Sequence, residues 1–513
     1  DLNPIAFVAG RPYMDLSAYI NIPGIAYHLD VLEAVDRTKG KVIADMVRAK
    51  HLHPVPIPFT AWITLRAAYA RMGLRSLWWL CRRRTPVDLR AAYARTTDRL
   101  REVVRRPLDQ DSPSVLLADL NREFDDETDP TKDGLRHLGL AMALHQALQR
   151  LCGRRVPPDL IDALSKGIPH NPTTTISLDL WALAQEARPL ADLFEKTPPG
   201  QLADRLNAME EGRRWWRRFD TFLARHGHRG EVELDITTPR WREDPTFLLH
   251  SVTNYLRHQA GTPTPPEMLA AGLRRREAAA SAIRQQLPWP LRGLFGWLYE
   301  RYVLWLPFRE AMKYTWLLGL EHARRVYREL GRRLVAAGHL KTADDVFWLR
   351  LQEVRTWAES ETVTWTPAVL EGRAREWREW TAHRPPSLIV GCRGIVEEET
   401  VLTVPLAGSR LLRGTPVSAG RAEGVARVIT DPHHADLRPG EILVTRYTDP
   451  AWTPLFFTAG ALITEVGGLL SHGAVVAREI GLPAVVGVED ATTRIDSGRR
   501  IRVNADDGTV ELL

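Results

Sequence analysis

The sequence is poor in cysteine and has no long apolar run. Three of its 513 residues are cysteines, Cys81, Cys152 and Cys392, and they lie far apart and form no CxxC motif. A reducing, cytoplasmic compartment is therefore the simplest interpretation. No apolar stretch reaches the length of a membrane span, and the first residues lack the plan of a signal peptide, so we expect no membrane partner.

A strong charge of one sign is also missing. The 69 Lys and Arg residues and 63 Asp and Glu residues leave a net charge of +6. This mild, dispersed basicity is not a nucleic-acid signature, and an anionic substrate or a nucleotide-bearing partner fits it equally well. The hydrophobic share of 44% and charged share of 26% are typical of a globular protein. A chain of this length predicts about three domains of ~150 residues.

The stretch 461–487 is the most informative part of the sequence. A β-rich run, 461–466, leads into the glycine pair Gly467 and Gly468. Ser471 then stands where its hydroxyl can cap the first amides of a short helix. Gly481 ends that helix and the proline two residues later prevents its continuation.

His472 is therefore predicted in the first turn of this helix. Unpaired amides and the helix dipole favour negative charge there. A histidine held in such a place can carry a phosphoryl group on a ring nitrogen. The alternative, a histidine that merely lies near a helix cap, is the more common case on position alone.

The complete string from Gly467 to Val485 favours the phosphoryl-carrier interpretation of His472. It reads Gly-Gly-x-x-Ser-His-x-Ala-x-Val-Ala-Arg-Glu-x-Gly-x-Pro-Ala-Val. This string resembles the phosphohistidine swivelling domain of the phosphoenolpyruvate-utilising enzymes, which include pyruvate phosphate dikinase, phosphoenolpyruvate synthase and rifampicin phosphotransferase. Runs 414–428, 439–445 and 448–452 resemble earlier parts of the same domain. The resemblance implies that His472 is the phosphoryl carrier, with Ser471, Gly467 and Gly468 near the phosphoryl group.

Two positions depart from the family pattern. Members of the family often have Thr before the Ser-His pair and Ala after it, whereas this chain has Leu470 and Gly473. Both changes leave the histidine in place. We expect them to alter how the phosphoryl group is held.

Residues from about 60 to about 390 have helical patterns. Pro- and Asp-rich breaks separate helices rather than domains, and aromatic stripes such as the one in 211–226 are interpreted as core packing. Before them, 6–17 reads as a short hairpin-like piece. It resembles the segment that follows the ATP-binding domain in rifampicin-phosphotransferase-like enzymes, so the chain is expected to be the back two-thirds of such an enzyme.

A polar, turn-rich island occupies 225–245. Its His226-x-His228 pair suggests a metal site weakly, because no third ligand follows at a usable spacing. We favour a buried polar network that joins helices, and we predict no metal in this chain.

A second candidate site lies on a helix predicted over 308–337. At ~100° per residue, one apolar stripe is expected to contain Met312, Trp316, Leu320, Ala323, Tyr327, Leu330 and Leu334. Glu321 and several arginines fall on the opposite, solvated face. Arg309, Lys313 and Arg324 line one flank of the stripe, where their stems stay buried and their charges reach a cleft. The alternative is a helix flank whose cations simply reach solvent.

The string around this helix resembles the antibiotic-binding domain of rifampicin phosphotransferase. The resemblance implies that Arg309 and Lys313 meet the phosphohistidine at the acceptor, and Arg324 is added as a further phosphoryl ligand. Arginine binds two phosphoryl oxygens at once and lysine supplies a compact charge, which phosphoryl transfer needs. Because a neutral imidazole must accept the group, slightly alkaline conditions are expected to help loading of His472.

These observations predict a multidomain protein with a large, mostly α-helical substrate domain and a small C-terminal β/β/α swivelling domain. We assign 1–390 to the helical acceptor domain, 391–411 to a linker and 412–513 to the phosphohistidine domain. Strands are expected at 424–430, 441–446, 461–466, 484–488, 499–504 and 509–512.

The predicted function is a phosphotransferase component. His472 would carry a phosphoryl group from a partner domain or subunit, resembling an ATP-grasp domain and charged by ATP or phosphoenolpyruvate with Mg²⁺, to a hydroxyl on a small molecule. One alternative is a biosynthetic enzyme that phosphorylates its substrate to activate it for condensation or elimination. Another is a binding or regulatory module with a relic carrier domain.

Overall fold

The computed structural model describes residues 5–8, 11–14, 85–125, 134–258, 263–382, 389–390, 394–395, 410–431, 436–449, 452–468 and 471–513. They form two compact units, each built from separate stretches of chain. The first unit takes the described residues of 1–77, 105–126 and 322–409, and the second takes those of 78–104, 127–321 and 410–513. The predicted linker over 391–411 lies mostly outside the described residues, so the predicted domain boundaries stay a prediction.

The first unit is mostly helical. Its two N-terminal strands pair antiparallel with Ile5 opposite Met14, which confirms the hairpin-like piece. Its elements are β1 (Ile5–Val8), β2 (Arg11–Met14), α6 (Pro113–Asp125), the second half of α16 (Phe308–Ala336), η4 (Ala343–Trp348), α17 (Leu351–Ser360), α18 (Pro367–Ala382), β3 (Ile389–Val390) and β4 (Gly394–Ile395).

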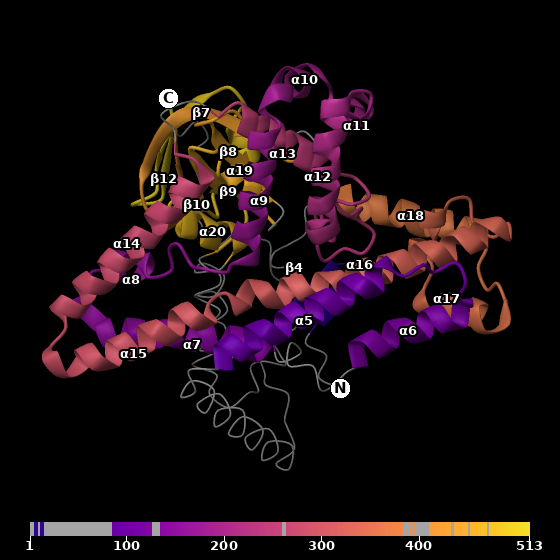
Figure 1. Ribbon diagram of the computed structural model, residues 1–513, viewed down its shortest axis with the longest axis horizontal. Helices are drawn as coiled ribbons and strands as arrows, with labels where there is room; N and C mark the ends of the chain where they lie inside the picture. The colour runs from indigo at the N-terminus through magenta and orange to yellow at the C-terminus, as the bar shows by residue number, and fades with distance from the viewer. Residues whose placement is uncertain are drawn as a thin grey trace, which may run out of the picture. The chain divides into compact units, whose positions relative to one another are not determined.

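The second unit contains most of the remaining helices (Figure 1). They are α5 (Thr85–Arg105), α7 (Gly134–Cys152), η2 (Gly153–Arg155), α8 (Pro158–Ala163), α9 (Pro172–Glu186), η3 (Arg188–Leu190), α10 (Ala191–Lys196), α11 (Pro199–Asn207), α12 (Glu210–His226), α13 (Thr246–Leu256), α14 (Pro265–Gln286), α15 (Trp289–Trp305) and the start of α16. The aromatic stripe of α12 is core, as predicted, with Trp215 and Phe219 buried and stacked.

Helix α16 corrects one prediction, because it is buried on several sides rather than along one stripe. Trp316, assigned to the stripe, is 46% exposed, whereas Leu317 and Leu318 between the predicted positions are buried. Glu321, expected on the solvated face, is buried and forms an ion pair with Arg242. The periodicity fails because more than one element contacts α16: Thr97 of α5 bonds to Thr315, and Arg242 of the 225–245 island pairs with Glu321.

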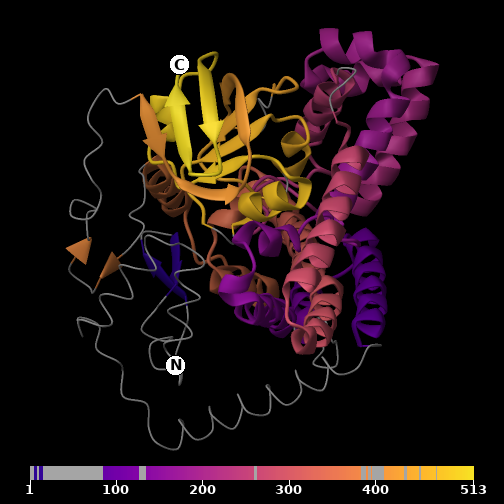
Figure 2. The ribbon, with the colours of Figure 1, turned by 90° about the vertical axis from the view of Figure 1, so that its left-hand side faces the viewer.

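The C-terminal part of the second unit is one mixed sheet with short helices. Figure 2 shows its strands, in orange and yellow, gathered in one layer beside the helices of the same unit. The strand order is β5-β12-β11-β7-β8-β9-β10-β6, and β7, β8, β9 and β10 run parallel. The strands are β5 (Leu411–Arg413), β6 (Thr415–Ser418), β7 (Arg421–Val428), β8 (Ile442–Thr445), β9 (Ala461–Thr464), β10 (Ala484–Val486), β11 (Arg500–Asn504) and β12 (Thr509–Leu512). Three short helices accompany them, α19 (Thr453–Phe456), α20 (His472–Ile480) and α21 (Ala491–Arg494).

This arrangement confirms a mostly helical chain with a small mixed-sheet region at its C-terminal end. All six predicted strands are present within a few residues of their predicted bounds, and Gly481 ends α20 in the left-handed conformation. One apolar core joins the sheet region to the helices, because Trp452, Leu455 and Phe456 are buried in the same cluster as residues of α9 and α13. In the part of the chain that the structure describes, no helix is long and apolar enough to span a membrane.

Candidate active site

Helix α20 begins at His472, as the motif predicts. Ser471 is its N-cap in extended conformation, but its hydroxyl makes no capping bond to the described first-turn amides, so that detail of the prediction is wrong. The hydroxyl instead faces Gly467, where an added Cβ would lie 3.1 Å from it. Gly467 has a φ of +148°, which favours glycine, and the carbonyl of Gly468 accepts from the Ser471 amide at 3.0 Å. These three residues thus form the turn before His472.

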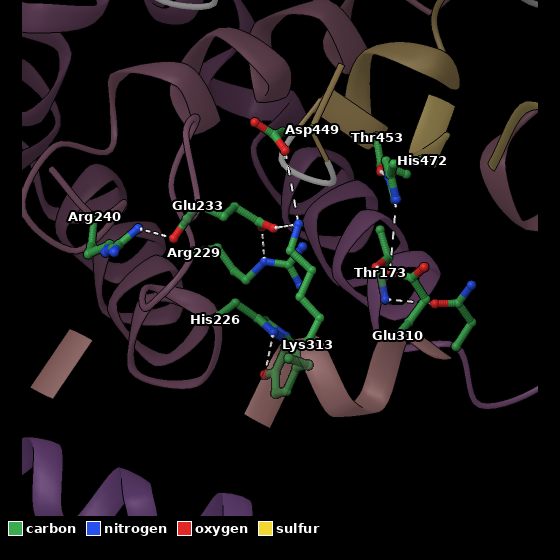
Figure 3. Close-up of polar contacts among 12 residues, drawn as sticks. Thr173, His226, Arg229, Glu233, Arg240, Glu310, Lys313, Asp449, Thr453 and His472 are labelled. Atoms are coloured by element: carbon green, nitrogen blue, oxygen red, sulfur yellow. Dashed lines mark hydrogen bonds and ion pairs between the residues drawn. The ribbon is translucent and has the colours of Figure 1, made fainter. Parts of the chain in front are cut away.

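The imidazole of His472 lies between a hydroxyl and a carboxylate (Figure 3). Its Nε2 is 3.1 Å from Thr453 Oγ1, and its Nδ1 is 3.9 Å from Glu310 Oε2. The side chain is 12% exposed. Thr173 Oγ1 donates to the same Glu310 oxygen at 3.2 Å. The largely buried ring therefore has polar neighbours from α16 and α19, and α9 supplies a partner to one of them.

The first two turns of α16 bring both predicted cations to this site. Arg309 Nη2 lies 3.1 Å from Glu310 Oε1 and 3.8 Å from Glu479 Oε1, a carboxylate of α20. Lys313 Nζ lies 2.6 Å from Glu233 Oε2 and 3.9 Å from Asp449 Oδ1. Each cation thus contacts two carboxylates, one of which comes from the sheet region.

Arg324 is not brought into this group. It is buried in the first unit, where its guanidinium lies 5.2 Å from the centre of the Phe347 ring. Eleven residues of helix, about 16 Å at 1.5 Å per residue, separate it from Lys313. Arg324 and Lys313 share a flank by their angle around the helix axis, but the prediction did not include their separation along that axis.

The polar island at 225–245 is a buried network, as predicted, and it holds Lys313 in place. Arg229 Nε donates to the Glu233 carboxylate, and Arg240 Nη1 donates to the Glu233 carbonyl at 2.9 Å. His226 bridges Asp179 Oδ2 at 2.9 Å and the Tyr314 hydroxyl at 3.1 Å. Among the described residues, no cluster of three or more His, Cys, Asp or Glu could hold a metal ion.

The electrostatics of the site fix the protonation of its central pair. Burial lowers the pKa of His472 from 6.5 to about 3, with Lys313 and Arg309 acting in the same direction and Glu310 against them. Burial by itself raises the pKa of Glu310, but the charges led by Arg309 outweigh it and lower that pKa to about 2. At neutral pH the ring is neutral and the carboxylate is ionised. The lowered pKa of His472 argues against the expected benefit of alkaline conditions for loading, because the ring is already neutral below pH 7.

Two carboxyls from the sheet region behave differently. Burial raises the pKa of Glu479 to about 7, although Arg309 and the Asn171 amide, which donates at 2.7 Å, lower it. Burial also raises the pKa of Asp449 to about 6, with Lys313 acting against the rise. Both groups titrate close to neutral pH.

Five polar residues of the site were missed as site residues by the sequence reasoning. They are Thr173, Glu310, Asp449, Thr453 and Glu479. Three of them stand in runs already noted for their resemblance to the family, so the runs were a usable signal. Thr173 and its neighbour Asn171 had no such signal, because only the fold brings α9 to α20.

Comparison with known proteins identifies two parts of the chain. Residues 135–310 match the family described as the rifampicin phosphotransferase fourth domain. Residues 437–508 match the mobile domain of the phosphoenolpyruvate-utilising enzymes. The resemblance to the phosphoenolpyruvate-utilising enzymes and to rifampicin phosphotransferase is thereby confirmed, and the fourth-domain match ends at 310, within the first turn of α16.

Individual relatives extend this similarity. The chain is 32% identical over 374 residues to the rifampicin phosphotransferase of Bacillus subtilis (strain 168), across 68% of this chain and 41% of that protein. It is 29% identical over 546 residues to the rifampicin phosphotransferase of Streptomyces sp, across 100% and 59%. It is 30% identical over 523 residues to the prodigiosin synthesizing transferase PigC of Serratia marcescens, across 97% and 57%. The chain thus spans between about two fifths and three fifths of these relatives.

Proposed function

We propose that this chain acts as a phosphotransferase. The premise is that it is a relative of the rifampicin phosphotransferases, with a match to their fourth domain and to the mobile domain of the phosphoenolpyruvate-utilising enzymes. His472 carries a phosphoryl group to a hydroxyl of a small molecule held by the helical region. One observation supports this above all others: the His472 ring lies against the turn of α16 that presents Arg309 and Lys313 (Figure 3).

The surroundings of the ring favour Nε2 as the nitrogen that is phosphorylated. A neutral imidazole carries one proton, and the ionised Glu310 carboxylate beside Nδ1 favours the tautomer with that proton on Nδ1. Nε2 then keeps its lone pair and accepts from the Thr453 hydroxyl at 3.1 Å. Once Nε2 is phosphorylated, Glu310 stabilises the positive charge of the ring, which keeps Nε2 a good leaving group.

Arg309 and Lys313 stabilise the phosphoryl group during transfer. The group spreads negative charge over three oxygens, and a guanidinium and an ammonium held at one end of α16 can face them. Both cations already contact carboxylates, which positions them in advance. The carboxylates neutralise the two cations between turnovers, and the incoming phosphoryl group then competes with the carboxylates for them.

The donor and its partner complete the proposal. ATP or phosphoenolpyruvate, with Mg²⁺, would be bound by an ATP-grasp-like domain or subunit, and the sheet region would move between that donor and the helical acceptor site. The likeness of 437–508 to a mobile domain supports this movement.

A radiolabelling experiment tests the function. The chain is mixed with its ATP-binding partner and with ATP labelled at the β- or γ-phosphate in separate reactions. Acid-labile label should appear on wild type and be absent from His472→Ala. Lys313→Ala should accept the label and transfer it poorly to rifampicin or to co-purified cell metabolites. Label on His472→Ala at the wild-type level would reject His472 as the carrier.

A second function is favoured by one specific observation. The similarity to the prodigiosin synthesizing transferase covers 97% of this chain. In this version the phosphorylated acceptor is an intermediate that reacts further, so the final product contains no phosphate. The mass of the product separates the two: a stable gain of one phosphate indicates a phosphotransferase, and a phosphate-free condensed product indicates a synthetic enzyme. A non-catalytic relic is disfavoured because the ring keeps polar partners on both nitrogens.

A further inference from the structure

Asp449 lies close in sequence to Thr453, the residue that contacts Nε2 of His472. Thr453, whose hydroxyl touches Nε2, lies four residues after Asp449, and the amide of Trp452 donates to the Asp449 carbonyl at 2.9 Å. The preceding Thr448 packs on the residue after His472, because a Cβ at Gly473 would lie 2.4 Å from Thr448 Oγ1. Thr448 and Thr453, on either side of Asp449 in sequence, thus both lie against the start of α20.

Two carboxylates of the site therefore come from different elements and contact different groups. Glu310 faces Nδ1, whereas Asp449 lies beside Lys313, one of the two cations that meet the phosphoryl group in the proposed function. Lys313 connects them, because it lies one turn after Glu310 on α16 and 3.9 Å from Asp449 Oδ1. Figure 3 shows the Asp449 carboxylate directed toward the Lys313 ammonium.

The carboxylates of the site are not equivalent as proton acceptors. Glu310 is held ionised by its cations, so it has little affinity for a proton at neutral pH. The Glu233 side chain is fully buried and contacts both Arg229 and Lys313. Asp449 is 25% exposed, has its closest cation at 3.9 Å, and has a pKa raised to about 6 by burial. A base with a pKa near the working pH is the most effective.

We propose that Asp449 is the catalytic base that accepts the proton of the acceptor hydroxyl. The inference rests on the proposed phosphoryl transfer through His472. The acceptor oxygen forms its bond to phosphorus while the bond from phosphorus to Nε2 breaks, and that electron pair returns to Nε2. The hydroxyl proton passes to an Asp449 oxygen, and Nδ1 keeps its own proton beside Glu310. The total charge of −2 on alcohol, phosphoimidazolium and aspartate is conserved in phosphomonoester, imidazole and aspartic acid.

The test needs neither the natural donor nor the natural acceptor. Phosphoramidate, a small phosphoryl donor that reacts with imidazoles, loads His472 in the full chain, and water serves as the acceptor probe. Loss of phosphohistidine is followed by phosphorus NMR between pH 5 and 8. Asp449→Asn should load as wild type does and lose the phosphoryl group at least about 10-fold more slowly at pH 7, because base catalysis contributes about 10²–10⁴.

The pH profile separates base catalysis from a structural effect. The wild-type rate constant relative to that of Asp449→Asn should rise through pH 6 and then level off, and Asp449→Glu should recover part of the rise. The titration also reflects the charged groups that face Asp449 from the packed elements, Lys313, Glu233 and Arg229. Lys313→Met should therefore move the midpoint upward, because Lys313 lowers this pKa. Asp496→Asn, an exposed aspartate of the sheet region, is the matched control.

Two failures are distinguishable. If wild type takes up no phosphoryl group on His472, the proposed function fails first. If it loads and Asp449→Asn has the wild-type rate and pH profile, Asp449 is not the base and the carrier role of His472 stands.

Discussion

The low pKa of His472 should make protein stability depend on pH in a defined direction. The folded chain holds the ring neutral down to a pKa of about 3, whereas the ordinary value of 6.5 applies to the unfolded chain. Because the unfolded state then binds the extra proton, the group removes stability as the pH falls below 6.5, and this loss levels off near pH 3. Above pH 6.5 the group contributes no pH dependence.

The size of this effect follows from the two pKa values. Each pH unit inside the window changes the free energy of unfolding by about 1.4 kcal/mol, so wild type should lose about 2 kcal/mol through this group between pH 7 and pH 5. His472→Gln has no such proton to bind. Its free energy of unfolding, relative to wild type, should therefore improve by about 2 kcal/mol over the same range.

Urea unfolding at pH 7.5, 6, 5.5 and 5 measures this difference. The window stops at pH 5 because Glu310, whose pKa is lowered to about 2, withdraws its own stabilisation as the pH falls through 4.5. His339→Gln, at an exposed position, is the control and should follow wild type. A difference between His472→Gln and wild type that is the same at pH 7.5 and pH 5 would refute the reasoning. Loading of His472 by phosphoramidate should also stay flat from pH 8 to pH 5, whereas free imidazole slows.

Three further substitutions test the contacts around the ring. Glu310→Gln should slow loading of His472 at least about 10-fold, since it removes the charge that keeps the lone pair on Nε2. Phosphorus NMR of the loaded ring should show phosphorylation at Nδ1 as well as at Nε2. Loading at Nε2 alone and at the wild-type rate would contradict this role. Asn171→Ala removes the 2.7 Å bond to Glu479 that ties α20 to the start of α9. Transfer to the acceptor should fall about 10–100-fold, the loss of one hydrogen bond to a charged group, and loading should not change. Gly473→Ala should lower the melting temperature because its Cβ would lie 2.4 Å from Thr448 Oγ1; in a Thr448→Ala background it should not, and an equal loss in both backgrounds would locate the clash elsewhere.

Local sequence signals predicted the sheet region well. Its strands, the start of α20 at His472 and the end at Gly481 depend on alternation, glycine and proline, which act within a few residues. The family string added the predicted carrier role of His472 and the predicted pair Arg309 and Lys313. The structure places those two cations at the ring.

The rest depended on contacts that no local pattern contains. Helix α16 is packed from several directions, so its single predicted stripe and the solvated position of Glu321 were wrong. Arg324 shares a helical flank with Lys313 and yet lies three turns away. Glu310 was overlooked because a glutamate beside an arginine on a helix is ordinary until another element brings a histidine against it.

The apolar core shared by α19 with α9 and α13 bears on the rate of the movement proposed for the sheet region. Trp452, Leu455 and Phe456 are buried in that core, so movement of the sheet region away from the helices would expose them to water. Exposure of apolar surface to water raises the heat capacity. Release of the sheet region should therefore show a curved temperature dependence, with an activation enthalpy that grows on warming. Movement about a hinge without exposure of this core would give a linear dependence of the logarithm of the release rate on reciprocal temperature.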